Sequence, residues 1–235
     1  MHTAFVTENG ELYACGNGNE GQLGLGKKSR EYLPKAITRT PEPVERVACG
    51  IFHTCFISTS GHVYAMGGNN FGQLGNGTKK RSLTPIVCKA LQGKRVRYLA
   101  CGHHSAAVTD QGELYVWGTG VFGEYLSPQR FQALDQDVFF KHVSIGGTFG
   151  AAVSKEGSVW TWGMNTNGEL GVGDNEPRLY PVAVQSIHHK NVEKVSCGGS
   201  FALSTGTVVH ETSSTTPPTE MASPSVRSTV PAAPD

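Results

Sequence analysis

Three histidines are the residues in this chain whose type and spacing first suggest chemistry. His53 and His104 lie 51 residues apart, and paired imidazoles are common metal ligands and proton carriers. His2 lies another 51 residues before His53, so all three occupy one position of a repeating pattern. A residue that recurs once per repeat is expected to serve the architecture. We therefore predict that these histidines form hydrogen bonds to the backbone of a neighbouring repeat.

The cysteines do not have the spacing of a metal site. They are Cys15, Cys49, Cys55, Cys88, Cys101 and Cys197, and none forms a Cys-x-x-Cys pair. Cys49, Cys101 and Cys197 also share one repeated position, which we interpret as a small buried side chain. We interpret the adjacent pairs His103-His104 and His188-His189 as lacking the set of cysteines or carboxylates that a metal site needs. The sequence predicts no metal site.

The residue types that enzymes need are not combined here. The glycine-rich stretches are not followed by the Gly-Lys-Ser/Thr of a phosphate-binding loop. The sequence indicates no nucleophile, general base and orienting acid that could together form a catalytic site. The sequence therefore predicts a protein that is not an enzyme and that binds no cofactor.

Two matching basic loops do not follow from the repeat pattern. Lys27-Lys28-Ser29-Arg30 corresponds to Thr78-Lys79-Lys80-Arg81, whereas the fourth repeat has Asp174-Asn175-Glu176 at this place. Such cations are either solvated loop charges or a docking patch for an acidic protein surface or a phosphate backbone. The net charge of +1 indicates no general attraction to nucleic acid, so only this local patch would bind it. The candidate partner-binding residues are Lys27, Lys28, Arg30, Lys79, Lys80 and Arg81.

The elements that position these residues are four tandem repeats. The letters Gly-Glu-Leu-Tyr-Ala-Cys-Gly at 10–16 recur with small changes at 61–67, 112–118 and 157–163. The motif Gly-Gln/Glu-Leu-Gly follows at 21–24, 72–75 and 168–171, and a short x-x-Cys/Ile-Gly segment ends at Gly50, Gly102, Gly146 and Gly198. A period near 50 residues is typical of propellers and other arrays.

Each repeat has four strand-sized segments. A small alternating segment, a tight turn with glycine and a Tyr/Trp-rich segment predict a hairpin with a two-residue turn, in which the glycine supplies a positive φ. Pro34, Pro85 and Pro181 precede short apolar runs and indicate the start of an edge strand. We predict that Trp117, Trp160 and Trp162 pack in the core. The third repeat is six residues short, and the chain is expected to start in mid-unit at an innermost strand.

These motifs in this order resemble the regulator of chromosome condensation repeat family, and the resemblance covers about residues 1–206. It implies a seven-bladed β-propeller with one four-stranded sheet per blade. Seven units of this period would need roughly 350 residues, so we predict an all-β, incomplete propeller of about four four-stranded blades. Its open sheet edges would invite pairing with another chain. A truncated isoform, an incomplete gene model or an arc completed by a partner chain would each account for this.

The chain divides into two parts. Residues 1–206 form the predicted repeat domain, and residues 207–235 form a Ser/Thr/Pro-rich segment that we predict to be disordered. We recognise no signal peptide and no run of 18 apolar residues. We expect an intracellular protein of the cytoplasm, the nucleus or both, which is not secreted.

Function is predicted from the loops, because one propeller fold carries many functions. The resemblance implies a non-catalytic scaffold for protein–protein interaction. The alternatives are a guanine nucleotide exchange factor for a Ran-like small GTPase, as in the founding member of the family, and a non-functional fragment of a longer repeat protein. Exchange in the family depends on an inserted hairpin wedge, and the unit spacings of 51, 51, 45 and 49 leave no room for one. The expected partner is a protein: a small GTPase or an acidic protein surface.

Overall fold

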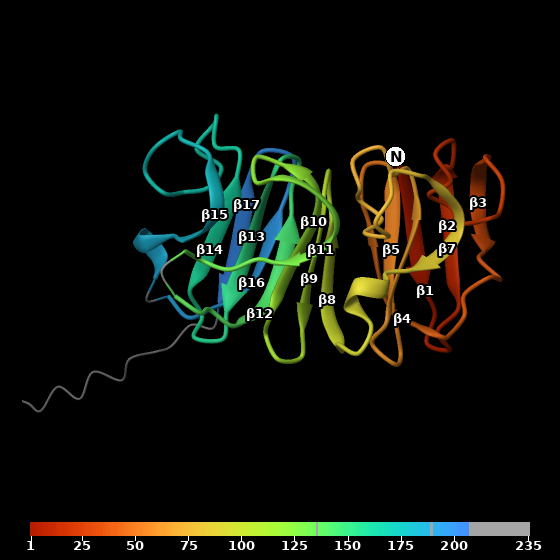
Figure 1. The fold of residues 1–235 in the computed structure, drawn as a ribbon, viewed down its shortest axis with the longest axis horizontal. Coiled ribbons are helices and arrows are strands. Elements are labelled where there is room, and N and C mark those ends of the chain that lie inside the picture. Colours follow the sequence, from red (N-terminus) through yellow and green to blue (C-terminus); the bar gives the residue numbers. More distant parts are fainter. Residues whose placement is uncertain (135, 189, 207–235) are drawn as a thin grey trace, which may run out of the picture.

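The computed structural model describes residues 1–134, 136–188 and 190–206. These residues form 17 β-strands in five antiparallel sheets that stand side by side, from β3 on the right of Figure 1 to β15 on the left. The predicted disorder of residues 207–235 lies outside the described residues. Within the described part, no helix has the length and hydropathy that a membrane span requires.

Three sheets have four strands each, and a smaller sheet stands at either end of the array. The first sheet comprises β1 (His2–Val6), β2 (Leu12–Asn17) and β3 (Arg30–Ala36). The second comprises β4 (Val44–Cys49), β5 (His53–Ser58), β6 (Val63–Gly67) and β7 (Ser82–Val87). The third comprises β8 (Val96–Cys101), β9 (Ser105–Thr109), β10 (Leu114–Gly120) and β11 (Gly123–Arg130). The fourth comprises β12 (Phe140–Ile145), β13 (Phe149–Ser154), β14 (Val159–Gly163) and β15 (Arg178–Ala183), and the fifth comprises β16 (Val192–Cys197) and β17 (Ala202–Gly206).

The prediction of about four propeller-type blades is confirmed. Strands follow one another in chain order within each sheet. Short 3-10 helices, η1 (Lys89–Leu91) and η2 (Gln185–Ile187), lie on two of the connections between sheets. Neighbouring sheets contact each other mainly through their first strands, β4, β8, β12 and β16, and these are the innermost strands.

The expectation that the chain starts at an innermost strand is wrong. His2 on β1 pairs with Gly16, as His53 on β5 pairs with Gly67. The strand equivalent to β1 is therefore β5, the second strand of a complete sheet, which lies between β4 and β6. The residues of β5 are buried on both faces because the first sheet packs against one face of the second sheet and the third sheet packs against the other.

The hairpin turns contain three residues rather than the predicted two. Gly61 donates to the carbonyl of Ser58, and Ser58 pairs with His62, so residues 59–61 form the loop. This is a type I turn followed by a left-handed residue, and Gly61 has a φ of +87°. The predicted positive φ is confirmed.

The prolines lie in the outermost strands, as predicted, although within them rather than at their start. In β7 the register shifts between Ala65–Ile86 and Gly67–Ser82, which places Pro85 in a bulge. Pro34 and Pro181 lie in the corresponding bulges of β3 and β15. A bulged edge position needs no backbone donor, so proline fits there.

The apolar core lies between the sheets. Trp117 and Trp162 are fully buried and Trp160 nearly so, which confirms their predicted place in the core. One cluster joins the third and fourth sheets through side chains such as Val116, Val143 and Trp162. Because each sheet buries its faces against its neighbours, the array holds the loops at the sheet ends in a regular order.

Candidate partner-binding face

In each four-stranded sheet, the connections after the first and the third strand emerge at the same end, because neighbouring strands run antiparallel. In the second sheet these are residues 50–52 and residues 68–81. In the first sheet the connection between β2 and β3 emerges at this end. We call this end of the molecule the loop face. The two basic loops predicted from the sequence both belong to it.

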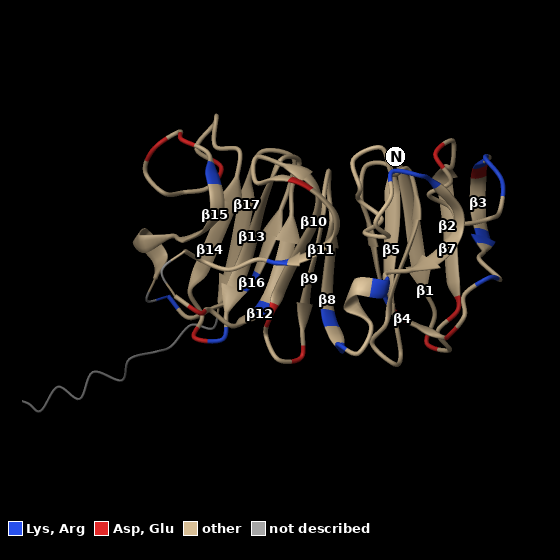
Figure 2. Cartoon of the chain, viewed as in Figure 1, with Lys and Arg blue, Asp and Glu red and all other residues tan. Residues whose placement is uncertain are grey.

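The basic loops of the first and second repeats lie side by side. All six candidate cations are exposed, and Arg81 forms an ion pair with Glu20 of the preceding loop at 3.0 Å. Lys79 pairs with Glu124 of the third sheet at 2.7 Å. Figure 2 shows the blue segments of both loops at one end of the molecule near the N-terminus, whereas the loop between β14 and β15 carries red segments.

Carboxylates neutralise part of this patch. Lys27 lies 3.9 Å from Glu31, so three of the six cations have an acidic partner. Lys28, Arg30 and Lys80 form no ion pair among the residues described here. The patch therefore carries a net charge of about +3 rather than the full charge of six cations.

Exposed apolar side chains accompany the cations on the loop face. Ile51 and Phe52, in the connection between β4 and β5, are 45% and 43% exposed, and Phe71 is 38% exposed. Phe71 packs against His103, with ring centroids 4.9 Å apart. Aromatic side chains beside arginine are typical of protein interfaces.

The loop between β14 and β15 in the fourth repeat carries negative charge, in contrast to the basic loops of the first two repeats. Asp174 forms an ion pair with Arg178 at 2.5 Å. The hydrogen bond from Arg178 is the main cause that lowers the pKa of the Asp174 carboxyl. Glu169 and Glu176 are in the same loop, so the loop face is cationic on one side and acidic on the other.

A second set of polar and charged residues was not identified from the sequence. Arg46, Tyr98, His142 and Lys194 hold equivalent positions on the four innermost strands and line a groove of about 460 Å³. The Arg46 guanidinium lies 5.2 Å from the Tyr98 ring centroid. Burial, followed by the charges of Lys194 and Arg46, lowers the pKa of His142. Each of these residues directly precedes the repeated x-x-Cys/Ile-Gly segment. The variation of residue type at this otherwise repeated position is the sequence signal that could have identified the set.

The repeated histidines bind the neighbouring sheet, but not its backbone as predicted. His53 Nε2 lies 2.7 Å from the hydroxyl oxygen of Ser105, and His2 Nε2 lies 2.7 Å from that of Thr54. The Ser105 hydroxyl donates to the Gln73 carbonyl at 2.9 Å. The backbone contact is thus made by the hydroxyl, which lies between the imidazole and the carbonyl.

His104 has a different environment. The residue of the fourth sheet that corresponds to Ser105 is Gly150, which has no hydroxyl. Both ring nitrogens of His104 are buried without a hydrogen-bond partner among the described residues. The ring packs edge-on against Phe122, with centroids 5.2 Å apart. The predicted hydrogen bond to the backbone of a neighbouring repeat is therefore not formed by His104 within the described part of the chain.

The interpretation of the repeated cysteines as buried is wrong. Cys49, Cys101 and Cys197 are partly exposed, because each ends an innermost strand and lines a groove of about 620 Å³ beside the loop face. Among the cysteines, only Cys55 and Cys88 are buried, and all six are free thiols.

One group on the opposite end contains the residue types of a catalytic triad. His62 Nδ1 lies 2.9 Å from Glu42 and 3.0 Å from the Ser60 hydroxyl. A triad needs the nucleophile and the carboxylate on different imidazole nitrogens, and here both contact Nδ1. Hydrogen bonds from Ser60 and then His62 lower the pKa of Glu42 to about 2. The group stabilises a turn and cannot relay a proton.

Comparison with known proteins places this array in a family. The family model described as RCC1-like domain matches residues 1–204. The chain belongs to the RCC1-like domain family. The family resemblance predicted from the repeat motifs is thereby confirmed.

Individual RCC1-like relatives are similar over most of this chain. The ultraviolet-B receptor UVR8 of Arabidopsis thaliana is 36% identical over 196 residues, which are 79% of this chain and 44% of that protein. The mitochondrial RCC1 domain-containing protein RUG3 of Arabidopsis thaliana is 32% identical over 215 residues, 84% of this chain and 48% of that protein. The chain therefore spans about half the length of these curated relatives.

A solved structure shows the same fold. Prp20p of Saccharomyces cerevisiae superimposes with a TM-score of 0.77 at 23% identity, over 89% of this chain and 55% of that chain. That structure was determined together with the binding of Prp20p to Gsp1p and histones. At this identity the similarity concerns the RCC1-like fold.

Proposed function

We propose that this RCC1-like chain is a non-catalytic protein-interaction module that docks an acidic protein surface on its loop face. The observation that carries this proposal is the juxtaposition of the two basic loops, joined by the Arg81–Glu20 ion pair. Opposite charge between partners speeds their encounter and fixes their orientation. Ile51, Phe52 and Phe71 add exposed apolar area that a partner could cover.

The charge pattern supports a single docking orientation. The cationic loops belong to the first two repeats, and the acidic loop belongs to the fourth. A partner whose acidic surface faces Lys28, Arg30 and Lys80 would be repelled if it rotated toward Asp174 and Glu176. Specificity on a repeating frame thus comes from side chains that do not repeat.

The test of this proposal reverses the charges that have no carboxylate partner. The variant Lys28→Glu, Arg30→Glu, Lys80→Glu leaves the ion pairs of Lys79 and Arg81 in place. A matched control, Lys89→Glu, Arg97→Glu, Lys190→Glu, makes the same change in charge at the other end of the sheets.

The full chain and both variants would be used for quantitative affinity capture, followed by titration of the captured partner at increasing salt. The loop-face variant should weaken binding at least tenfold and flatten its salt dependence, because electrostatic steering is screened by salt. The control should bind as the original chain does. Equal affinity of the original chain and the loop-face variant would contradict the proposal.

Nucleotide exchange on a Ran-like small GTPase is the second candidate. It is supported by the fold shared with Prp20p, whose binding to Gsp1p was studied with its structure. Release of labelled GDP from a panel of small GTPases separates the candidates. Acceleration by this chain would favour exchange, and capture of an acidic partner without acceleration would favour the scaffold. A chain inactive in both assays would fit the third alternative, a fragment of a longer repeat protein.

We also propose an intracellular location. The six cysteines are free thiols, which suits a reducing compartment. Fractionation of cells that express the chain, with antibodies to nuclear and cytoplasmic markers, would test this location.

A further inference from the structure

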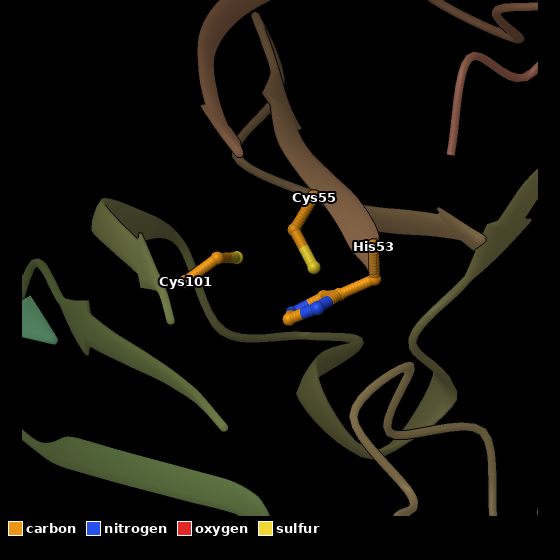
Figure 3. A group of neighbouring side chains, drawn as sticks. All are labelled: His53, Cys55 and Cys101. Carbon is orange, nitrogen blue, oxygen red and sulfur yellow. The ribbon is translucent and has the colours of Figure 1, made fainter. Parts of the chain in front are cut away.

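Three potential metal ligands meet at the interface between the second and third sheets. His53 and Cys55 lie on β5, and Cys101 is the last residue of β8. One ring nitrogen of His53 and the two sulfur atoms all lie within 4.8 Å of one another. Figure 3 shows the thiol groups of Cys55 and Cys101 directed toward the imidazole.

This group is not a consequence of the repeat. The position of Cys55 is held by Ala4, Ala106 and Ala151 in the first, third and fourth sheets and by Leu203 in the fifth. The position of His53 is held by Phe149 in the fourth sheet. Among the described residues, only this sheet interface combines a histidine with two thiols. Apolar residues occupy this position in the other sheets, so the fold of the repeat does not require a cysteine at position 55.

The hydrogen bonds around His53 leave one nitrogen available. The Ser105 hydroxyl donates its proton to the Gln73 carbonyl, so it accepts from His53 Nε2–H. In a neutral imidazole, Nδ1 then carries the lone pair. Nδ1 is buried and has no hydrogen-bond partner among the described residues. Metal-binding histidines usually donate their other N–H to a neighbouring oxygen, and Ser105 already fills this role.

The thiols suit a divalent thiophilic ion. Two thiolates, a neutral imidazole and one divalent cation have no net charge, so the ion could be buried without an unpaired charge. Sulfur and imidazole ligands are preferred by Zn²⁺, with ligand bonds of about 2.0–2.3 Å.

We propose that His53 Nδ1 and the thiolates of Cys55 and Cys101 bind one Zn²⁺ ion that links the second and third sheets. Binding replaces the two thiol protons, which pass to solvent. The partly exposed Cys101 lines the groove of about 620 Å³, which provides a path for the hydrated ion. A water molecule from the groove would complete the four ligands that zinc prefers.

The separation of the ligand atoms is compatible with this assignment. In a tetrahedral site with these bond lengths, ligand atoms lie roughly 3.5–3.8 Å apart. The present separations are at most 4.8 Å, so the ligand atoms would approach one another by about 1 Å on binding. An ion held by both β5 and the end of β8 would oppose separation of the two sheets.

The chain itself supplies suitable test variants. Cys55→Ala introduces the residue of the first, third and fourth sheets, and His53→Phe introduces that of the fourth sheet, so both are expected to fold. Cys49→Ala is the matched control, because Cys49 holds the same strand position as Cys101 and Ala4 stands at the position that corresponds to Cys55. Circular dichroism would confirm the β-structure of every variant.

The experiment measures metal binding by the full 235-residue chain under reducing conditions. Elemental analysis of the purified protein should give one zinc per chain, and substitution with Co²⁺ should produce sulfur-to-cobalt charge-transfer absorption. Both Cys55→Ala and His53→Phe should lose at least about 100-fold in zinc affinity, and Cys49→Ala should retain it.

Several outcomes would overturn the assignment. Folded protein without bound zinc and without the cobalt absorption would do so, as would zinc retained equally by Cys55→Ala and His53→Phe. A mass lower by two hydrogens that returns on reduction would assign Cys55 and Cys101 to a disulfide instead. None of these outcomes depends on partner binding at the loop face.

Discussion

His53 on the second sheet and Ser105 on the third are joined by a contact of 2.7 Å between Nε2 and the hydroxyl oxygen. The same contact joins His2 to Thr54 one interface earlier. Because each hydroxyl also donates to a backbone carbonyl of the preceding repeat, a polar chain crosses the sheet interface. Such buried chains are costly to interrupt, since the remaining group loses its partner.

Ser105→Ala should therefore destabilise the protein by about 1–3 kcal/mol, the cost of leaving a buried N–H of His53 without an acceptor. Urea unfolding with a chelator present would measure this hydrogen bond without any contribution from metal. The double variant with His53→Phe should recover part of the loss, because the unpaired donor is then removed. Strictly additive effects of the two substitutions would show that the contact contributes no coupling energy.

His104 should make stability fall in mild acid. Burial, with smaller contributions from His103 and His53, lowers the pKa of His104 from 6.5 to about 3. Between these values the unfolded chain binds a proton that the folded chain does not, so this contribution is complete above pH 6.5 and is lost as pH falls toward 3. At pH 5 the loss amounts to about 2 kcal/mol.

Replacing this histidine tests the linkage. His104→Phe, which places the residue found at Phe149, should flatten the dependence of unfolding free energy on pH between 7 and 5 by about that amount. Chemical denaturation at several pH values measures it. An unchanged slope would mean that His104 is protonated in the folded state or titrates equally in both states.

Gly102 should tolerate no side chain. A Cβ at this position would lie 2.0 Å from the carbonyl oxygen of Gly146, which lies in the connection between β12 and β13 of the next sheet. Since that atom belongs to the backbone, Gly102→Ala must push the third and fourth sheets apart and should cost several kcal/mol. Gly199→Ala is the control, because a Cβ there meets nothing within 4 Å. Thermal unfolding that gives both variants the same midpoint would contradict this prediction.

The β16–β17 sheet should mediate association between chains. Phe201 and Leu203 are 60% and 65% exposed, and β17 has a hydrogen-bonded neighbour on only one side among the described residues. Exposed apolar edge strands tend to pair with other chains. We expect light scattering to show concentration-dependent oligomers that Leu203→Lys reduces. A monodisperse monomer at all concentrations, with a single cooperative thermal transition, would exclude pairing through this edge.

Local features were predictable because they depend on a few neighbouring residues. The positive φ of Gly61 and the edge position of Pro85 follow from the backbone chemistry of glycine and proline. The burial of Trp117 follows from its place in a repeated apolar strand. The turn length was wrong, since two-residue and three-residue loops both accept a left-handed glycine.

Relations between sheets were harder to predict. The approach of Cys55 to Cys101 joins residues 46 positions apart, and no local spacing indicates it. The neutralisation of Arg81 by Glu20 likewise depends on how two neighbouring loops pack. Arg46 and Lys194 line the same groove only because the four innermost strands pack around it.

The amino-acid sequence by itself determined the repeat, its hairpins, its family and the loops in which positive charge collects. These follow from periodic patterns of small, aromatic and glycine residues that bury themselves within one unit. The tertiary structure decided which side chains of different units meet, because packing one sheet against the next brings together atoms that the chain order keeps far apart. The side chains that surround His53 and the carboxylates that pair with Lys79 and Arg81 are therefore decided at the interfaces between sheets.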